Sequence, residues 1–137
     1  MTVVLDTNVL ISGLLFPGGP PDKIVRAVLT GRIQNATSPD LLTELKRVLK
    51  KKFALSDEKL ETLVHLISDQ SDLVYPLERL SAIKSDEADN RVLECAETAH
   101  ADFIVTGDTK HLLSLKKFKG IAILSPADFI QKIPAPL

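Results

Sequence analysis

The chain has 137 residues, of which 45% are hydrophobic and 26% are charged, so we expect one compact globular domain. This composition excludes a disordered chain and a multidomain protein. A formal net charge of -1 excludes a global positive field for attracting nucleic acid, so any polyanionic partner would have to be held locally.

The single cysteine, Cys95, excludes an internal disulfide and a cysteine-rich zinc site, and it is typical of a reducing compartment. We therefore expect a cytoplasmic protein. The apolar stretch from Val3 to Phe16 carries Asp6 and Asn8, which makes it too short and too polar for a membrane span. It also lacks a basic leading segment, so we expect no signal peptide and no membrane partner.

The first half of the chain alternates predicted strands with predicted helices. Residues 3–5 form a doubly apolar run, typical of a strand buried on both faces of a parallel sheet. After a Pro/Gly loop, Pro21 suits the first turn of a helix that Gly31 ends. A short strand over 35–37 precedes a helix with Ser38 as its N-cap, which continues through residues 41–52.

The second half repeats this alternation. Its predicted elements are a helix opened by Ser56, a strand over 73–75, a helix capped by Asp86 from 87 to about 100, strands over 103–106 and 121–124, and a helix start at Ser125. Strands that alternate with helices predict an α/β fold with a mainly parallel sheet.

Four acidic residues lie where such a fold would bring them together. Asp6 and Asp108 each end a hydrophobic strand, and the carboxyl ends of parallel strands share one edge of the sheet. Glu44 lies on the apolar stripe of its helix, and Asp89 begins the apolar stripe of another. Each residue alone also fits a turn, a cap or a solvent-exposed ion pair. Their joint placement predicts one shared crevice.

A crevice of this kind requires a counter-charge. Two carboxylates about 5 Å apart repel each other by roughly 3 kcal/mol at an effective dielectric constant near 20. Oxygen ligands without Cys or adjacent His favour Mg²⁺ or Mn²⁺ over zinc. Such an ion would lower the pKa of a bound water and direct it at a phosphodiester. We therefore expect Asp6, Glu44, Asp89 and Asp108 to be metal ligands and catalytic residues of a hydrolase.

Three segments closely resemble the PIN-domain family of metal-dependent ribonucleases: VLDTNVL at 4–10, DEADN at 86–90 and ADFIVTGD at 101–108. The resemblance covers nearly the whole chain and includes the closing ILSPADF at 123–129. It is similar to the prokaryotic branch that contains toxins of toxin–antitoxin pairs. The resemblance implies a single PIN-like domain over 1–137, of three-layer α/β/α architecture, that cleaves RNA as an endoribonuclease and has a protein antitoxin as a possible partner.

The resemblance also assigns roles to residues. The four acids match the acidic quartet of the family, while Asn8 and Thr106 match polar positions that hydrogen-bond the carboxylates or the attacking water. Asp86 is a further candidate for a supporting position. Many relatives carry another acid shortly after the position of Asp108, whereas Thr109-Lys110-His111 follows here. This departure leaves the number of metals open, and with it the alternative of a non-catalytic module that binds RNA or protein.

Two basic groups could hold an RNA backbone: residues 46, 47 and 50–52 on one helix, and lysines near the last strand. The second group flanks Asp108, so we expect Lys110, Lys116 and Lys117 to contact phosphates. The three histidines are dispersed and fit no metal-site spacing. We therefore expect structural roles for them, with His111 the only one near the proposed crevice.

The sequence also indicates a surface for other protein chains. The apolar cluster of Leu10, Leu14, Leu15 and Phe16 exceeds what one small core requires. We therefore expect part of this cluster to form either a contact in a homodimer or higher homo-oligomer, or an antitoxin surface.

Overall fold

The computed structural model describes residues 1–80, 87–108 and 110–133, and Asp86 therefore lies outside the described residues. The described strands are β1 (Thr2–Leu5), β2 (Gln34–Thr37), β3 (Ser71–Leu73), β4 (Phe103–Val105), β5 (Lys117–Phe118) and β6 (Ile121–Leu124). The described helices are α1 (Thr7–Leu15), α2 (Pro20–Leu29), α3 (Pro39–Phe53), α4 (Asp57–Asp69), α5 (Glu87–Ala99), α6 (Leu112–Leu115) and α7 (Pro126–Ile130).

The strands form one sheet in the order β3-β2-β1-β4-β6-β5. Every pairing is parallel except that of the short edge strand β5 with β6. In the central pair, Leu5 of β1 lies opposite Val105 of β4. The residues that follow these two strands, Asp6 and Thr106, therefore emerge side by side at the carboxyl edge of the sheet.

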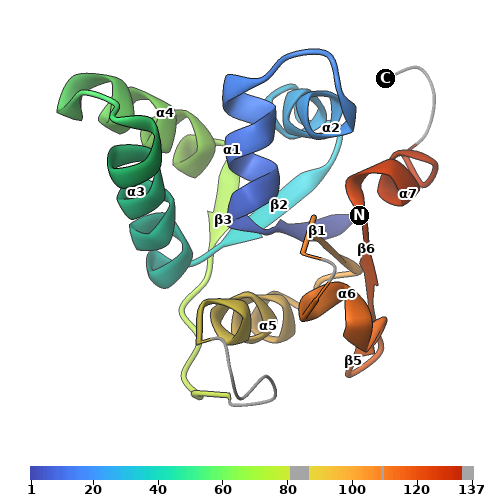
Figure 1. The fold of residues 1–137 in the computed structure, drawn as a ribbon. Helices are drawn as coiled ribbons and strands as arrows, with labels where there is room; N and C mark the ends of the chain where they lie inside the picture. The colour runs from blue at the N-terminus through green and yellow to red at the C-terminus, as the bar shows by residue number, and fades with distance from the viewer. Residues whose placement is uncertain (81–86, 109, 134–137) are drawn as a thin grey trace.

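Helices cover both faces of the sheet, as Figure 1 shows, with α1 and α2 on one side and α5 and α6 on the other. The side chains of β1 alternate between the two faces, as a strand requires. Val3 and Leu5 join the core beneath α1 to α4 and α7, whereas Val4 joins the core beneath α5 and α6. The predicted three-layer α/β/α architecture is confirmed.

The predicted serine caps are also confirmed. The Oγ atoms of Ser38, Ser56 and Ser125 each accept a hydrogen bond from a backbone N–H three residues ahead, at 3.3, 3.2 and 3.2 Å. This interaction satisfies one of the amide donors that a helix start leaves free. The cap of α3 sets where the helix that carries Glu44 begins.

Three elements escaped the sequence analysis: α1, α6 and β5. Helix α1 has buried residues on several sides, so it lacks the single apolar stripe by which a surface helix is found. Helix α6 and strand β5 have only four and two residues. Strand β3 covers 71–73 rather than 73–75. Within the described part of the chain, no helix is long and apolar enough to cross a membrane.

Candidate active site

A pocket of about 350 Å³ contains all four of the predicted acidic residues. Asp6 follows β1, Asp108 follows β4, and Glu44 and Asp89 come from α3 and α5. The rest of its lining consists of Thr7, Asn8, Val48, Lys52, Ala88 and His111. The fold thus gathers carboxylates from four separate segments at the carboxyl edge of the sheet.

Asp6 is buried and accepts three hydrogen bonds from neighbouring groups. It is only 6% exposed, and it caps α1 because its Oδ1 accepts the Thr7 N–H at 2.7 Å. Its Oδ2 accepts the Thr106 hydroxyl at 2.8 Å and the Asn8 amide at 3.2 Å. Burial raises the pKa of Asp6 to about 6. The hydrogen bonds from Thr106 and Thr7 oppose this rise, and the negative charges of Glu44 and Asp108 add to it.

Thr106 and Asn8 also connect Asp6 to the segment that carries Asp108. The Thr106 hydroxyl accepts the Asp108 N–H at 3.0 Å while it donates to Asp6. The Asn8 side-chain oxygen accepts the Gly107 N–H at 3.0 Å. These two side chains therefore fix the ends of β1 and β4 relative to each other, and both touch the Asp6 carboxylate.

The sequence left open whether Glu44 lies in the acidic crevice or forms an exposed ion pair, and the structure shows both contacts. Its Oε2 accepts a hydrogen bond from the Thr7 hydroxyl at 3.1 Å within the pocket. Its Oε1 lies 3.9 Å from Nη2 of Arg47, which is half exposed on the same helix. The carboxylate therefore lies at the border between the acidic pocket and a more basic surface.

Asp108 is held by the chain that follows it. Its carboxylate accepts the backbone N–H groups of Lys110, His111 and Leu112 at 3.0, 3.3 and 3.4 Å. Burial acts to raise the pKa of Asp108, but a hydrogen bond from Asp89 and these three amides outweigh it and lower the pKa below its ordinary value. Asp108 is thus stabilised as an anion.

His111 lines the pocket, in agreement with the expectation that it is the histidine near the crevice. Its Nδ1 is 3.3 Å from Oδ2 of Asp89 and 3.6 Å from Oδ2 of Asp108. One donor atom from each of these three residues falls within 4.8 Å of the others. The turn after β4 produces this contact by folding back toward Asp108. The three-residue spacing was the only sequence signal for it.

The lysines that we expected to contact phosphates lie outside the lining of the acidic pocket. Lys110, Lys116 and Lys117 are exposed and do not line the acidic pocket, whereas Lys52 of α3 does. Lys52 belongs to the basic group of residues 46, 47 and 50–52, which we considered the less favoured candidate for phosphate contacts.

A second hollow of about 350 Å³ adjoins the acidic pocket and shares Glu44 and Ala88 with it. Three arginines line this hollow, namely Arg47, Arg79 and Arg91. Nη1 of Arg79 lies 3.0 Å from Oδ2 of Asp40, and Nη2 of Arg91 lies 2.7 Å from the buried Glu94. Arg79 and Arg91 were not predicted as site residues, because no periodic pattern connects them with the acids.

The family model of the PIN domain matches residues 2–110, which include all four acids of the pocket. The chain belongs to the PIN domain family. A curated relative of this PIN-domain protein is the uncharacterized protein MJ1680 of Methanocaldococcus jannaschii. It is 35% identical over 118 residues, or 83% of this chain and 74% of the relative.

Two solved structures share the fold of this PIN domain. The first is VapBC2 from Rickettsia felis bound to a DNA fragment from their promoter. It has a TM-score of 0.64 and 14% identity over 91% of this chain and 98% of that one. The second is FitAB bound to the IR36 DNA fragment, with a TM-score of 0.55 and 17% identity over 90% and 94%. The predicted family and fold class are therefore confirmed.

The chemistry of the pocket fits a hard divalent cation. Carboxylate oxygens are the ligands that Mg²⁺ and Mn²⁺ prefer. Burial raises the pKa of Asp6, and the negative charges of Glu44 and Asp108 add a smaller rise, so a cation beside this carboxylate would favour its charged form. The donor set thus matches the cofactor expected from the sequence.

Proposed function

We propose that this PIN domain is a divalent-metal-dependent endoribonuclease that hydrolyses RNA phosphodiester bonds. The observation that carries the proposal is the single pocket lined by Asp6, Glu44, Asp89 and Asp108. When bound there, Mg²⁺ or Mn²⁺ would supply an activated water and neutralise charge at the phosphate. The four carboxylates would hold the ion.

The chain's own polar groups would keep these ligands in position. Thr106 and Asn8 hold Oδ2 of Asp6, and Thr7 holds both Oδ1 of Asp6 and Oε2 of Glu44. Each carboxylate oxygen has two lone pairs, so these hydrogen bonds orient the ligands and still leave lone pairs for a metal. The hydroxyl groups of Thr7 and Thr106 thus act as positioning groups.

The neighbouring arginine hollow supports a polyanionic substrate. Arg47, Arg79 and Arg91 line a hollow that shares Glu44 with the acidic pocket, so a strand whose phosphate lies at the acids would place its next phosphates near guanidinium groups. We propose these arginines as the principal phosphate contacts. Lys110, Lys116 and Lys117 are the competing assignment.

We further propose that the protein is the toxin of a toxin–antitoxin pair, acts in the cytoplasm, binds a protein antitoxin and forms a homodimer or higher homo-oligomer. The shared fold with VapBC2 and FitAB supports this proposal. The alternative is a PIN-like module that binds RNA or protein without cleaving it, which the absence of a further acid shortly after Asp108 favours.

A cleavage assay tests the proposal. Mixed single-stranded and structured RNAs are incubated with the protein and Mg²⁺, Mn²⁺ or a chelator, with DNA of the same sequences in parallel. We expect divalent-dependent cleavage of RNA that Asp6→Asn abolishes. The matched control is Asp69→Asn, an exposed acid at the end of α4, which should cleave like the parent.

Two results would contradict the proposal. Cleavage that persists in chelator, or in Asp6→Asn, would show that the four-acid pocket is not the catalytic site. Metal binding by the parent without turnover of any RNA would instead favour the non-catalytic module.

A further inference from the structure

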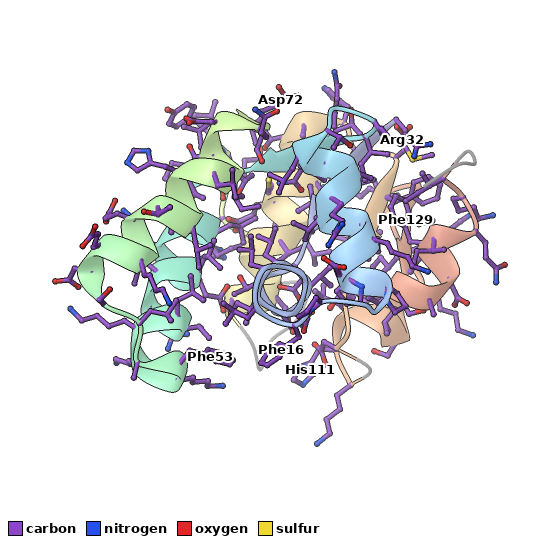
Figure 2. All side chains as sticks on the ribbon, turned by 90° about the horizontal axis from the view of Figure 1, so that it is seen from above. Phe16, Arg32, Phe53, Asp72, His111 and Phe129 are labelled. Atoms are coloured by element: carbon purple, nitrogen blue, oxygen red, sulfur yellow. The ribbon has the colours of Figure 1, made fainter. Side chains whose placement is uncertain are left out.

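His111 brings a nitrogen donor to the carboxylate pocket. It stands immediately before α6, and its side chain is about one third exposed. Its Nδ1 approaches Oδ2 of Asp89 to 3.3 Å and Oδ2 of Asp108 to 3.6 Å. The three donors come from two elements far apart in the chain, the start of α5 and the turn after β4 (His111 is labelled in Figure 2).

The separations suit ligands of one ion. An octahedral ion with bonds of about 2.1 Å places neighbouring ligand atoms about 3 Å apart and opposite ones about 4 Å apart. Both measured nitrogen–oxygen distances are close to the neighbouring value, and all three donor atoms fall within 4.8 Å of one another. Small side-chain rotations would be enough to bring the three donors around a common centre.

The backbone holds these groups in this arrangement. The N–H groups of Lys110 and His111 both donate to Oδ1 of Asp108, which fixes the carboxylate relative to the residue that carries the imidazole. Since the same turn orients Asp108 and His111, the ring reaches the pocket through the fold of this segment and not only through a flexible side chain.

The chemical consequence concerns which metal is preferred. Mg²⁺ is bound mainly by oxygen atoms, whereas imidazole nitrogen suits transition ions, whose affinities rise from Mn²⁺ through Fe²⁺ to Co²⁺. His111 lies in the short stretch after Asp108 in which the sequence shows no further acid. A nitrogen donor at this position changes the donor set from all oxygen to mixed oxygen and nitrogen.

We propose that His111 is a nitrogen ligand of the divalent ion in this pocket and that the site therefore selects a transition ion such as Mn²⁺ over Mg²⁺. The inference rests on the proposed function, because it adds a ligand to the same metal. It goes further in naming the ligand and the class of ion.

The test measures bound Mn²⁺ directly and does not depend on cleavage. Pulsed electron paramagnetic resonance of Mn²⁺ on the full chain should show coupling to an imidazole ¹⁴N, which becomes ¹⁵N coupling when histidine is isotopically labelled. His111→Asp should remove this coupling. Calorimetric titration of the same variant should show Mn²⁺ affinity reduced by about tenfold, with Mg²⁺ affinity unchanged or increased. The control is His65→Asp, a change at an exposed residue of α4, which should keep both the nitrogen coupling and the Mn²⁺ affinity of the parent.

The possible results separate this inference from the proposed function. Bound Mn²⁺ without nitrogen coupling in the unmodified protein would overturn the role of His111 and leave the carboxylate site standing, and this measurement requires no variant to fold. If the parent binds neither ion, or if Asp6→Asn leaves binding unchanged, both the ligand assignment and the metal-dependent nuclease would be overturned.

Discussion

The Asp6 carboxylate shows how much the burial of one charged side chain costs the folded state. Its pKa rises from an ordinary 3.8 to about 6, mainly because it is buried. One pKa unit corresponds to about 1.4 kcal/mol, so the charged form at neutral pH costs the folded state about 3 kcal/mol without a cation. A bound divalent ion would remove much of this cost. On the proposed function, the burial of Asp6 would therefore favour metal binding and would also lower the stability of the metal-free chain.

Asp6→Asn should stabilise the metal-free protein. We expect its free energy of unfolding at pH 7.5 to exceed that of the parent by about 1–2 kcal/mol, because relief of the buried charge outweighs the poorer hydrogen bond between two amides at Asn8. The measurement is urea unfolding in chelator. Asp69→Asn, which changes an exposed acid, should leave the value within about 0.5 kcal/mol.

The pH dependence of this difference has a definite sign. The folded pKa of Asp6 lies above its unfolded value, so the folded state holds this proton more tightly, and the stability it contributes is present below about pH 3.8 and is lost as the pH rises to about 6. The advantage of Asp6→Asn should therefore shrink as the pH falls from 6 to 4. A difference that stays constant over this range would contradict the assigned pKa.

Thr106→Val is expected to weaken metal binding without removing a ligand. The threonine is fully buried, donates to Asp6 and accepts from the Asp108 N–H, and valine has nearly the same shape but neither function. We expect Mn²⁺ affinity to fall by about tenfold, a typical cost for a group that orients a ligand. Calorimetry checks this, and Thr106→Ser, which keeps the hydroxyl, should restore most of the affinity. An unchanged affinity in the valine variant would show that Thr106 has only a structural role.

At the level of elements, the contact between α1 and α2 depends on Gly13. A Cβ atom at this position would lie 2.3 Å from Cγ2 of Val25 and 2.6 Å from the carbonyl oxygen of Pro21. Both distances are far inside van der Waals contact, and one involves backbone that cannot easily move. Helix α1 begins at the Asp6 cap, so this packing also determines where Thr7 and Asn8 lie.

Gly13→Ala should lower the free energy of unfolding by about 2–3 kcal/mol, even though alanine favours a helix over glycine by about 1 kcal/mol. Chemical denaturation measures the loss, and Ser12→Ala on the same helix should be neutral or slightly stabilising. If Gly13→Ala were as stable as the parent, α2 would have to be free to move away from α1.

The exposed face between α3 and α5 allows the two candidate phosphate sites to be compared. In an Asp6→Asn background that prevents cleavage, Arg47→Gln with Arg79→Gln should reduce the slope of log affinity against log salt by about 1.4, since each lost phosphate contact on a single strand contributes about 0.7. Fluorescence anisotropy with labelled RNA measures the slope. Lys116→Gln with Lys117→Gln is the matched control. A flattened slope in the lysine pair alone would favour the assignment made from sequence.

For the whole molecule, the sequence could predict those site residues whose position follows from topology. A parallel sheet forces the residues after β1 and β4 to one edge, and helix periodicity turns Glu44 and Asp89 inward. The placement of these acids therefore needs only the order of elements. The caps of α3, α4 and α7 followed from local signals, because each helix starts directly after a serine.

The remaining site residues could not be predicted because their position depends on loop conformation. The sequence placed His111 near the crevice, but the contacts of its ring with Asp89 and Asp108 depend on how the chain packs around the Asp108 carboxylate. Arg79 is held by Asp40 and Glu94, which lie 39 and 15 residues away in the chain. Neither arrangement produces a helix or strand periodicity by which it could be recognised in the sequence. The predicted bounds of β3, 73–75 instead of Ser71–Leu73, were wrong for a related reason: three residues offer too little alternation to locate a strand.

Two aromatic rings mark a face of the molecule that the core does not use. Phe16 is 57% exposed and Phe53 is 36% exposed, with ring centroids 6.1 Å apart at the ends of α1 and α3 (Figure 2). Leu10 is buried, and Leu14 and Leu15 pack against the core, so Phe16 alone of the apolar cluster expected at a protein contact is largely free. Leu15, which precedes Phe16 in the chain, lines a separate groove of about 630 Å³ together with Leu55, Leu63 and four polar residues of the segment 56–62.

If the exposed rings hold two copies together, their removal should yield monomers without unfolding the chain. We expect the parent to sediment as a dimer or larger species at micromolar concentration, and Phe16→Ser with Phe53→Ser to sediment at the 15.0 kDa of one chain. The double variant should melt at a lower temperature than the parent, because Phe53 is only 36% exposed and the contact between the two rings is lost, but it should still unfold in one cooperative transition. Leu77→Ser, which changes an almost fully exposed leucine, serves as the control and should not alter the assembly. A parent that remains monomeric would overturn the homo-oligomer and leave this face to an antitoxin, whose binding the same double variant should then weaken.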